Sequence, residues 1–350
     1  MSGLLLLGAW ALLVWVLAWD ARRLSLGLLL IWAAITAVHL VAPQSGLASA
    51  LGGSERIWLV WGGIGAVAAA YIAGLRHLRR RAAPAPQPAE PAPEPGKLTE
   101  SELDRYARHL VLRELGGPGQ RKLRAARVLV AGAGGLGAPV LLYLAAAGVG
   151  RITLADSDRV SLSNLQRQVI FRSDDTGRPK VEAARAQMAA LNPHVEITTL
   201  PRDLVAGDEA LFAQHDLVLD GTDRFEARAA INAAAAAARV PLLSGAIAQW
   251  EGQVTLFDPA RGGPCMACLF PAAPEPGLAP PCAAAGVVGP LPGVIGAMMA
   301  LEAIKHLAGA GAGLRGAMII FDGLYGETRR IRTSPRPDCP VCAGMARNTA

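Results

Sequence analysis

One stretch in the middle of the chain constrains the fold more than any other. An apolar run at 128–130 leads into the glycine-rich segment 132–137, and the helix-like segment APVLLYLAAAG follows at once. A strand, a tight glycine turn and a helix in this order form a nucleotide-binding crossover, in which the helix N-terminus faces a phosphate. A second run, RITLAD, ends at Asp156, about twenty residues after the turn, where a carboxylate usually binds a ribose hydroxyl. We therefore predict that Asp156 and the turn bind a nucleotide through Gly132, Gly134, Gly135 and Gly137.

Apolar runs and helix-forming segments alternate after this turn. Helices are expected over 181–191 and 227–238. Strands are expected over 195–200, 217–219, 241–244 and 253–257. Strands that alternate with helices predict a doubly wound, mostly parallel, Rossmann-like α/β sheet. Ahead of the turn, Thr99 and Glu102 have the spacing of a capping box, which predicts the start of a helix.

The first 81 residues differ from the rest of the chain. Hydrophobic residues make up 52% of the sequence and the mean hydropathy is +0.32, and the excess lies in apolar runs at 4–19, 24–42 and 57–75. With a rise of 1.5 Å per residue, helices of this length come close to the ~30 Å core of a bilayer. We predict a membrane anchor of about three transmembrane helices over 1–81. The alternatives are buried core helices, or a cleaved signal peptide for the first run, although no basic residue precedes Leu4.

Arginines set the expected orientation of this anchor. Arg22 and Arg23 follow the first run, and a cluster at 76–81 follows the third. Positive residues are retained on the cytoplasmic side, and both groups lie there if the N-terminus is outside. We therefore expect a multi-pass protein of the inner (plasma) membrane whose C-terminal domain, 97–350, is in the cytoplasm. A Pro/Ala-rich linker at 82–96 separates the two parts.

The net charge argues against nucleic acid as a partner. Residues 1–96 hold seven arginines against four acidic residues, which is +3 of the total of +6. Residues 97–350 therefore have a net charge of +3, which is too small for a surface that binds nucleic acid. The sequence also has no basic stripe with interleaved aromatic residues.

Four of the five cysteines form two CxxC pairs about seventy residues apart, Cys265 with Cys268 and Cys339 with Cys342. Four thiolates suit a tetrahedral zinc ion. A redox role for one CxxC pair is the alternative, but two matching pairs in one domain favour zinc. Because four thiolates leave no open coordination position, we expect a structural zinc site.

The segments after the glycine turn resemble a known family. DSDRVSLSNLQRQVIF at 156–171 and GRPKVEAA at 177–184 are the most specific motifs, and RYARHLVL, VPLLSGAIAQWEGQVTLF and PLPGVIGAMMALEAIK extend the likeness over 99–345. They resemble the ThiF/MoeB/HesA family of E1-like adenylyltransferases, which activate ubiquitin-like sulfur carrier proteins. The apolar N-terminal region lies outside this resemblance.

The resemblance implies a reaction, cofactors and partners. The reaction is the ATP-dependent adenylation of the C-terminal glycine carboxylate of a carrier that ends in Gly-Gly, which gives an acyl-adenylate and pyrophosphate for later sulfur transfer. The implied cofactors are ATP, Mg²⁺ and Zn²⁺. The implied partners are the carrier, a sulfurtransferase or cysteine desulfurase as sulfur donor, and a second copy of the chain in a homodimer. Molybdopterin and thiamine synthesis are the implied pathways.

Matching the motifs residue by residue gives the expected site. Arg167 and Lys180 are the expected catalytic cations, Asp223 is the expected magnesium ligand, and Arg108 resembles an arginine donated across the dimer interface. Positive charge is needed because adenylation brings two anions together. The expected nucleotide contacts beyond the glycines are Asp156, Asp158, Ser163, Asn164, Leu165, Gln166, Arg167, Gln168, Lys180, Asp223 and Arg224. Among these, Asp158 is expected to be a structural partner of the SNLQR turn, and support of the metal is the alternative.

Three positions carry special interest. Relatives usually have Asn where this chain has Arg224, and many have Cys at the position of Gly221, so the magnesium or adenine side of the site is expected to differ. Cys282 lies in a Pro/Gly-rich stretch in which related enzymes use a cysteine for sulfur or thioester transfer. It is a candidate acceptor, and the alternative is an incidental small residue.

Two other classes of function share part of this pattern. An NAD-dependent oxidoreductase would also have the glycine turn and Asp156, but it would not need Arg167, Lys180, Asp223 and the paired cysteines. A membrane scaffold, or a relative that adenylates another small molecule or a tRNA base, is the second alternative.

Overall fold

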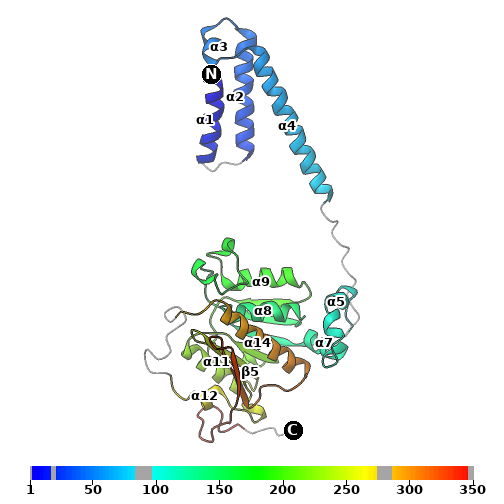
Figure 1. The fold of residues 1–350 in the computed structure, drawn as a ribbon, viewed down its shortest axis with the longest axis vertical. Helices are drawn as coiled ribbons and strands as arrows, with labels where there is room; N and C mark the ends of the chain where they lie inside the picture. The colour runs from blue at the N-terminus through cyan, green and yellow to red at the C-terminus, as the bar shows by residue number, and fades with distance from the viewer. Residues whose placement is uncertain (1, 17–20, 83–96, 274–285, 346–350) are drawn as a thin grey trace. The chain divides into compact units, whose positions relative to one another are not determined.

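An eight-stranded sheet forms the centre of the larger of the two units into which the chain divides, Met1–Glu90 and Pro91–Ala350 (Figure 1). The computed structural model describes residues 2–16, 21–82, 97–273 and 286–345. Across the sheet the strands are β3 (Glu196–Leu200), β2 (Arg151–Ala155), β1 (Arg127–Ala131), β4 (Leu217–Asp220), β5 (Leu242–Ile247), β6 (Glu251–Phe257), β7 (Ala317–Asp322) and β8 (Glu327–Arg332).

The sheet has a parallel and an antiparallel half. Strands β3, β2, β1, β4 and β5 pair in parallel, as the alternating pattern predicts. Strands β6, β7 and β8 add antiparallel pairs, so the sheet is mixed and the predicted mostly parallel pairing holds for the first half only. Short loops, 248–250 and 323–326, join β5 to β6 and β7 to β8, and loops of this length can connect only antiparallel neighbours.

Helices cover both faces of the sheet, which confirms the doubly wound arrangement. Side chains alternate across a strand, so Val128 and Leu129 of β1 enter different cores. The first core is closed by α7 (Gly116–Ala125), α8 (Gly137–Ala146), α9 (Lys180–Leu191) and α14 (Pro290–Ala308). The second is closed by α10 (Glu209–Phe212), α11 (Phe225–Ala237) and α12 (Met266–Leu269). The predicted helices and strands agree with the structure within about three residues at each end, whereas α7, α14, β7 and β8 were not expected.

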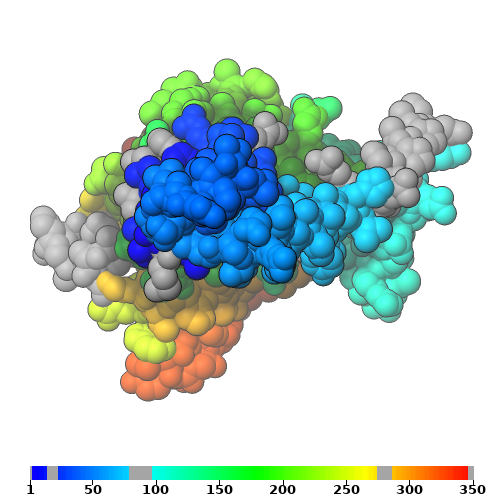
Figure 2. Space-filling model, turned by 90° about the horizontal axis from the view of Figure 1, so that it is seen from above, coloured from blue at the N-terminus to red at the C-terminus, as the bar shows by residue number. Residues whose placement is uncertain are grey.

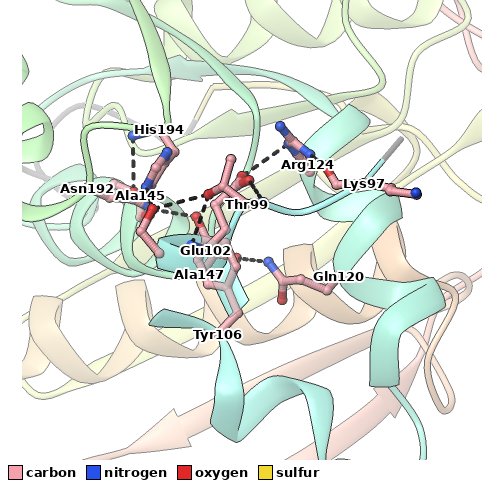
Figure 3. A network of polar contacts seen from close by, with 11 residues as sticks. Lys97, Thr99, Glu102, Tyr106, Gln120, Arg124, Ala145, Ala147, Asn192 and His194 are labelled. Atoms are coloured by element: carbon pink, nitrogen blue, oxygen red, sulfur yellow. Dashed lines mark hydrogen bonds and ion pairs between the residues drawn. The ribbon is translucent and has the colours of Figure 1, made fainter. Parts of the chain in front are cut away.

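A buried polar network fixes the start of this unit (Figure 3). Helix α5 (Glu100–Arg105) begins with the predicted capping box, in which Glu102 accepts a hydrogen bond from the Thr99 N–H at 2.9 Å. The Glu102 carboxylate is 2% exposed and pairs with Arg124 of α7 at 3.1 Å. The Tyr106 hydroxyl accepts a hydrogen bond from the Asn192 amide at 2.8 Å. The network therefore joins α5 and the following α6 (Ala107–Leu110) to the helical layer over the sheet.

The smaller unit consists of α1 (Ser2–Val16), α2 (Ala21–Val41), α3 (Gly46–Leu51) and α4 (Glu55–Ala82). Figure 2 looks down on this unit, in blue to light blue, from the end that carries α3. The first predicted span, 4–19, is helical to Val16, and 17–20 lie outside the described residues. Helix α4 passes the predicted end of the third span and includes the arginine cluster. It ends at Ala82, two residues before Pro84, because a helix usually stops before a proline.

Tryptophans pack this unit tightly from within, but its outer surface is apolar. The Trp32 indole N–H donates to the Trp58 carbonyl at 2.8 Å, and a Cβ on Gly62 would lie 2.1 Å from the Trp32 ring. Outward-facing apolar side chains include Leu5, Val67 and Tyr71, which are 71%, 70% and 67% exposed. By length and composition, Arg23–Val41 and Glu55–Leu78 could cross a membrane.

Helix α14 meets the same length and composition criteria, but it is a core helix. Half of its apolar window is buried, against 17% and 6% for the two candidates in the smaller unit. Its residues Ile295, Met299 and Ala303 lie in the first core of the sheet. The structure thus separates α14 from the helices that expose their apolar faces.

Replacing Glu102 with Ala should lower the free energy of unfolding by about 1–3 kcal/mol, because it removes the cap and leaves Arg124 without its buried partner. The measurement is urea-induced unfolding of the detergent-solubilised protein, followed by proteolysis. Glu100→Ala is the matched control, since Glu100 is exposed in the same helical turn and should change the value by less than about 0.5 kcal/mol. Equal effects of the two substitutions would contradict a role for the network.

Candidate active site

A cavity of about 960 Å³ opens at the carboxyl ends of the parallel strands. Residues from the ends of β1, β2, β4 and β5 line it, together with Thr255 of β6. Strand β1 lies between β2 and β4, so the chain order reverses at this point of the sheet. Doubly wound sheets bind ligands in the crevice at such a switch point.

The glycine turn forms one wall of the cavity. Gly132 has φ +91°, and a Cβ there would lie 3.4 Å from the Gly221 carbonyl. A Cβ on Gly137 would lie 1.9 Å from the Gly132 oxygen. Only glycine permits this close approach of the backbone, which leaves the start of α8 open to a phosphate.

Asp156 is tied to this turn by its carboxylate. One oxygen accepts the Ala133 N–H at 2.7 Å and the other accepts the Asp158 N–H at 2.8 Å. Burial raises the pKa of Asp156, while the charge of Lys180 and the two N–H groups oppose that rise. Asp156 lines the cavity, and the sequence motif predicts that its carboxylate binds the ribose of the nucleotide.

Two cations lie on the same side of the cavity. Lys180 at the start of α9 is 4% exposed, and its ammonium group pairs with Asp158 at 2.8 Å. Arg167 donates to the Asn164 side chain at 3.0 Å. Asp158 was expected to support the SNLQR turn, and this expectation is wrong in its partner, because the carboxylate binds Lys180 instead. The buried cation and the guanidinium together can neutralise a polyphosphate.

Gln168 provides a sign of a missing ligand. The residue is 4% exposed and lines the cavity, and its side-chain oxygen has no hydrogen-bond partner among the described residues. Buried polar atoms are almost always paired. A hydroxyl or amino group of a ligand in the cavity would satisfy this oxygen.

Asp223 is presented to the cavity by the turn after β4. The fully buried Asp220 carboxylate accepts hydrogen bonds from the Thr222 N–H at 2.9 Å and from the Ser244 hydroxyl at 3.0 Å. Asp223 is exposed and lines the cavity, and its carboxylate has no hydrogen bond or ion pair within the part of the chain that is described. A carboxylate with free oxygens beside a phosphate site suits Mg²⁺, which binds through one or two carboxylates and phosphate oxygens.

The opposite wall contains polar residues that the sequence did not single out. Arg228 of α11 lines the cavity and donates to the carbonyls of Thr222 and Gly245, the latter at 2.8 Å. Gln253 and Thr255 reach the cavity from the antiparallel strand β6. Arg228 follows Asp223 by five residues in the sequence, but its contact with Gly245 of β5 depends on the pairing of β4 with β5.

Most of the predicted site residues meet in this cavity, and some do not. Those that line it are Gly132, Gly134, Gly135, Asp156, Asp158, Asn164, Arg167, Gln168, Lys180, Asp223 and Arg224. Those that do not are Arg108, Gly137, Ser163, Leu165 and Gln166. Gly137 packs behind the turn. Arg108 is exposed on α6, and its expected role in a partner subunit stays a prediction.

The four paired cysteines come together beside α12. The Sγ–Sγ distances are 3.8 Å for Cys265 and Cys268, 3.5 Å for Cys265 and Cys339, and 3.5 Å for Cys268 and Cys342. Four sulfurs that surround a zinc ion at ~2.3 Å would lie about 3.8 Å apart. Burial raises the pKa of Cys265 to about 11, so a metal charge is needed to keep that thiolate. The cluster fits the predicted structural zinc. Cys282 lies outside the described residues.

Comparisons with known proteins agree with this geometry. Residues 106–341 match the ThiF family. The chain is 45% identical over 251 residues to the sulfur carrier protein adenylyltransferase of Thermus thermophilus, over 70% of this chain and 93% of that protein. It is also 45% identical over 249 residues to the molybdopterin-synthase adenylyltransferase of Escherichia coli, over 70% and 98%. The SAMP-activating enzyme E1 of Haloferax volcanii is 44% identical over 246 residues, over 70% and 90%.

Solved structures share the fold of the larger unit. The Escherichia coli MccB structure with ATP aligns with a TM-score of 0.60 over 69% of this chain and 75% of that chain, at 24% sequence identity. At this identity the likeness supports the fold alone.

Replacing Cys268 or Cys342 with Ser should remove the zinc, since three thiolates and a hydroxyl bind it far more weakly than four thiolates. Metal analysis of the purified protein should find about one zinc per wild-type chain and almost none in either variant. Cys282→Ser is the matched control and should keep the metal. Wild-type protein that lacks zinc and contains disulfides between these cysteines would favour the redox alternative.

Proposed function

This chain belongs to the ThiF family and is an E1-like adenylyltransferase, and we propose that its substrates are ATP and the C-terminal glycine carboxylate of a ubiquitin-like sulfur carrier protein. Three of the most similar relatives are named for activating such carriers or the molybdopterin synthase. The observation that carries the proposal is that Arg167, Lys180 and Asp223 line one cavity with the glycine turn.

In the proposed reaction, a carboxylate oxygen of the carrier attacks the α-phosphorus of ATP. The bond from that phosphorus to the pyrophosphate oxygen breaks, which leaves an acyl-adenylate. Both reactants are anions, so the barrier falls when fixed positive charge faces them. Lys180 and Arg167 supply this charge, and Asp158 holds the Lys180 ammonium in place at 2.8 Å.

Asp223 would hold the magnesium ion. When it is bound, the metal supplies positive charge to the pyrophosphate oxygens. The carboxylate is available because no other side chain pairs with it in the described structure.

The carrier tail would enter beside the antiparallel half of the sheet. Ser244, Gln253 and Thr255 make that wall polar, and glycine residues at the end of the tail would leave the backbone slim enough to reach the phosphate. A second copy of the chain would add Arg108 to the site. Sulfur from a sulfurtransferase or cysteine desulfurase would then displace AMP from the adenylate on the way to a thiocarboxylate, and Cys282 is the candidate residue to accept the sulfur or to form a thioester with the carrier.

The proposed pathway is molybdopterin cofactor synthesis, because one relative at 45% identity is named for molybdopterin synthase; thiamine synthesis is the second candidate. An NAD-dependent oxidoreductase is not supported by the family. A tRNA base or another small molecule is less favoured as a substrate. The names of three relatives at 44% and 45% identity refer instead to a sulfur carrier protein, to SAMP and to molybdopterin synthase.

The smaller unit would anchor the enzyme in the plasma membrane. Its outer apolar side chains support this proposal, and so do the two candidate spans at Arg23–Val41 and Glu55–Leu78. Helix α1, together with the apolar residues that follow it in the sequence, would form the first of the three predicted spans. The arginines after α1 and at the end of α4 would then lie in the cytoplasm with the catalytic unit.

Arg167→Ala and Asp223→Asn should each lower carrier-dependent ATP–pyrophosphate exchange by about 100-fold or more, because Arg167 supplies positive charge to the transition state and Asp223 would hold the metal ion that supplies more. The assay uses the detergent-solubilised chain and a Gly-Gly carrier from the same genome. Glu226→Gln is the matched control, since Glu226 is exposed on α11 and outside the cavity lining. Undiminished exchange in both site variants would end the assignment of these residues.

Topology is tested by cysteine labelling in intact cells with a membrane-impermeant maleimide. Cysteine at exposed Ser49, between α2 and α4, should react, and cysteine at exposed Ser101 should react only after permeabilisation. The reverse pattern would invert the proposed orientation. Reaction of both in intact cells would exclude a sealed membrane anchor.

A further inference from the structure

An ion pair bridges the rim of the cavity at a distance from the phosphate side. Arg224, at the start of α11, donates to the Asp203 carboxylate at 2.9 Å. The other Asp203 oxygen accepts the Ser157 hydroxyl at 2.6 Å. All three residues line the cavity.

The bridge joins parts of the sheet that are not neighbours. Asp203 follows β3 and Arg224 follows β4, and both β2 and β1 lie between these strands. Three strand spacings correspond to about 14 Å. The pair therefore reaches across the carboxyl ends of the two strands that carry Asp156 and the glycine turn.

The wall beside this pair is apolar. Leu204, next to Asp203, is 5% exposed, and Phe225, next to Arg224, and Ile231 also line the cavity. The expected phosphate cations, Lys180 at the start of α9 and Arg167 in the SNLQR motif, line the same cavity. A nucleotide has a flat, weakly polar base at one end and phosphates at the other, so its base fits the apolar part when its ribose is at Asp156.

We infer that Arg224 is a base-binding residue, whose guanidinium lies on the face of the nucleotide base and is held there by Asp203. This inference rests on the proposed function, because it requires ATP in the cavity. A planar guanidinium stacks well on an aromatic ring, and the attraction grows when water is excluded. Ser157 positions Asp203 in turn.

The exposure of the pair suits this role. The side chains of Arg224 and Asp203 are 62% and 51% exposed, and an exposed pair contributes little to folding stability. Breaking this pair should therefore change nucleotide binding more than it changes folding stability. Because neither side chain reaches the reacting phosphorus, removing Arg224 should weaken nucleotide binding and leave the chemical step almost unchanged.

The same loop provides a matched control. Arg202 binds Asp208 through two hydrogen bonds of 2.8 Å each, and neither residue lines the cavity. Arg202 also donates to the Asp203 carbonyl at 3.0 Å, so it fixes the backbone of the loop that carries Asp203 without contributing a side chain to the cavity lining. If only the stability of the loop mattered, breaking either pair would have the same effect.

The experiment compares Arg224→Ala, Asp203→Asn, the double variant and Arg202→Ala in the full-length, detergent-solubilised protein. It measures KM for ATP and kcat in carrier-dependent exchange, and the Kd of a fluorescent non-hydrolysable ATP analogue. For Arg224→Ala we expect KM and Kd to rise about 5–20-fold while kcat stays within about twofold. Asp203→Asn should give a smaller rise, Arg202→Ala less than twofold, and the double variant no more than Arg224→Ala alone, because Asp203 acts through Arg224.

Three results would overturn the inference. They are an unchanged Kd in Arg224→Ala, an equal effect of Arg202→Ala, and additive losses in the double variant. Failure of the proposed function is seen separately, as wild-type protein that binds the ATP analogue but shows no exchange with any Gly-Gly carrier. In that case the binding series still tests Arg224.

Discussion

The carboxylate of Asp156 joins the parts on which the nucleotide site depends. It accepts one N–H from the glycine turn and one from Asp158, so the ends of β1 and β2 are held at a fixed spacing. Asp158 in turn pairs with Lys180 at the start of α9. Burial raises the pKa of Asp156 and the positive charge of Lys180 opposes that rise, so the cation favours the charged form of the acid. The turn, the ribose site and the phosphate cation therefore form one connected unit.

This arrangement keeps a cation in a nearly dry position before ATP arrives. Lys180 is 4% exposed, and an ammonium group so well buried needs an anionic partner. Asp158 is that partner, and its own exposure of 68% leaves it in contact with water. Asp158 therefore holds the ammonium group at the cavity wall, where a polyphosphate would bind. The charge that the reaction needs is built into the fold and is not created by ligand binding.

Local sequence rules predicted the features that depend on neighbouring residues. The glycine turn, Asp156 and the capping box of Thr99 and Glu102 each follow from a short motif, and all are found as expected. The two CxxC pairs were recognised although only the fold brings their sulfurs within 4.8 Å. The antiparallel half of the sheet was missed, because β6 pairs with β7 across about sixty intervening residues and no short pattern carries that register. The Arg228 contacts with Thr222 and Gly245 depend on β4 and β5 lying side by side, and Gln253 reaches the cavity because β6 pairs with β5.

Gly221 and Arg224, the two positions at which the family resemblance predicts a departure, lie in the turn after β4, and Gly221 contacts the glycine turn. A Cβ on Gly221 would lie 3.2 Å from the Leu136 Cβ and 3.3 Å from the Gly137 nitrogen, and a Cβ on Gly132 would lie 3.4 Å from the Gly221 carbonyl. The two turns therefore pack backbone against backbone, without a side chain between them. A cysteine at position 221 would have to displace one of these neighbours by a few tenths of an ångström. Because Asp223 and Arg224 follow Gly221 directly, this close packing sets how near the proposed metal ligand and the Arg224–Asp203 pair lie to the nucleotide turn, so the two unusual residues act on the same side of the cavity.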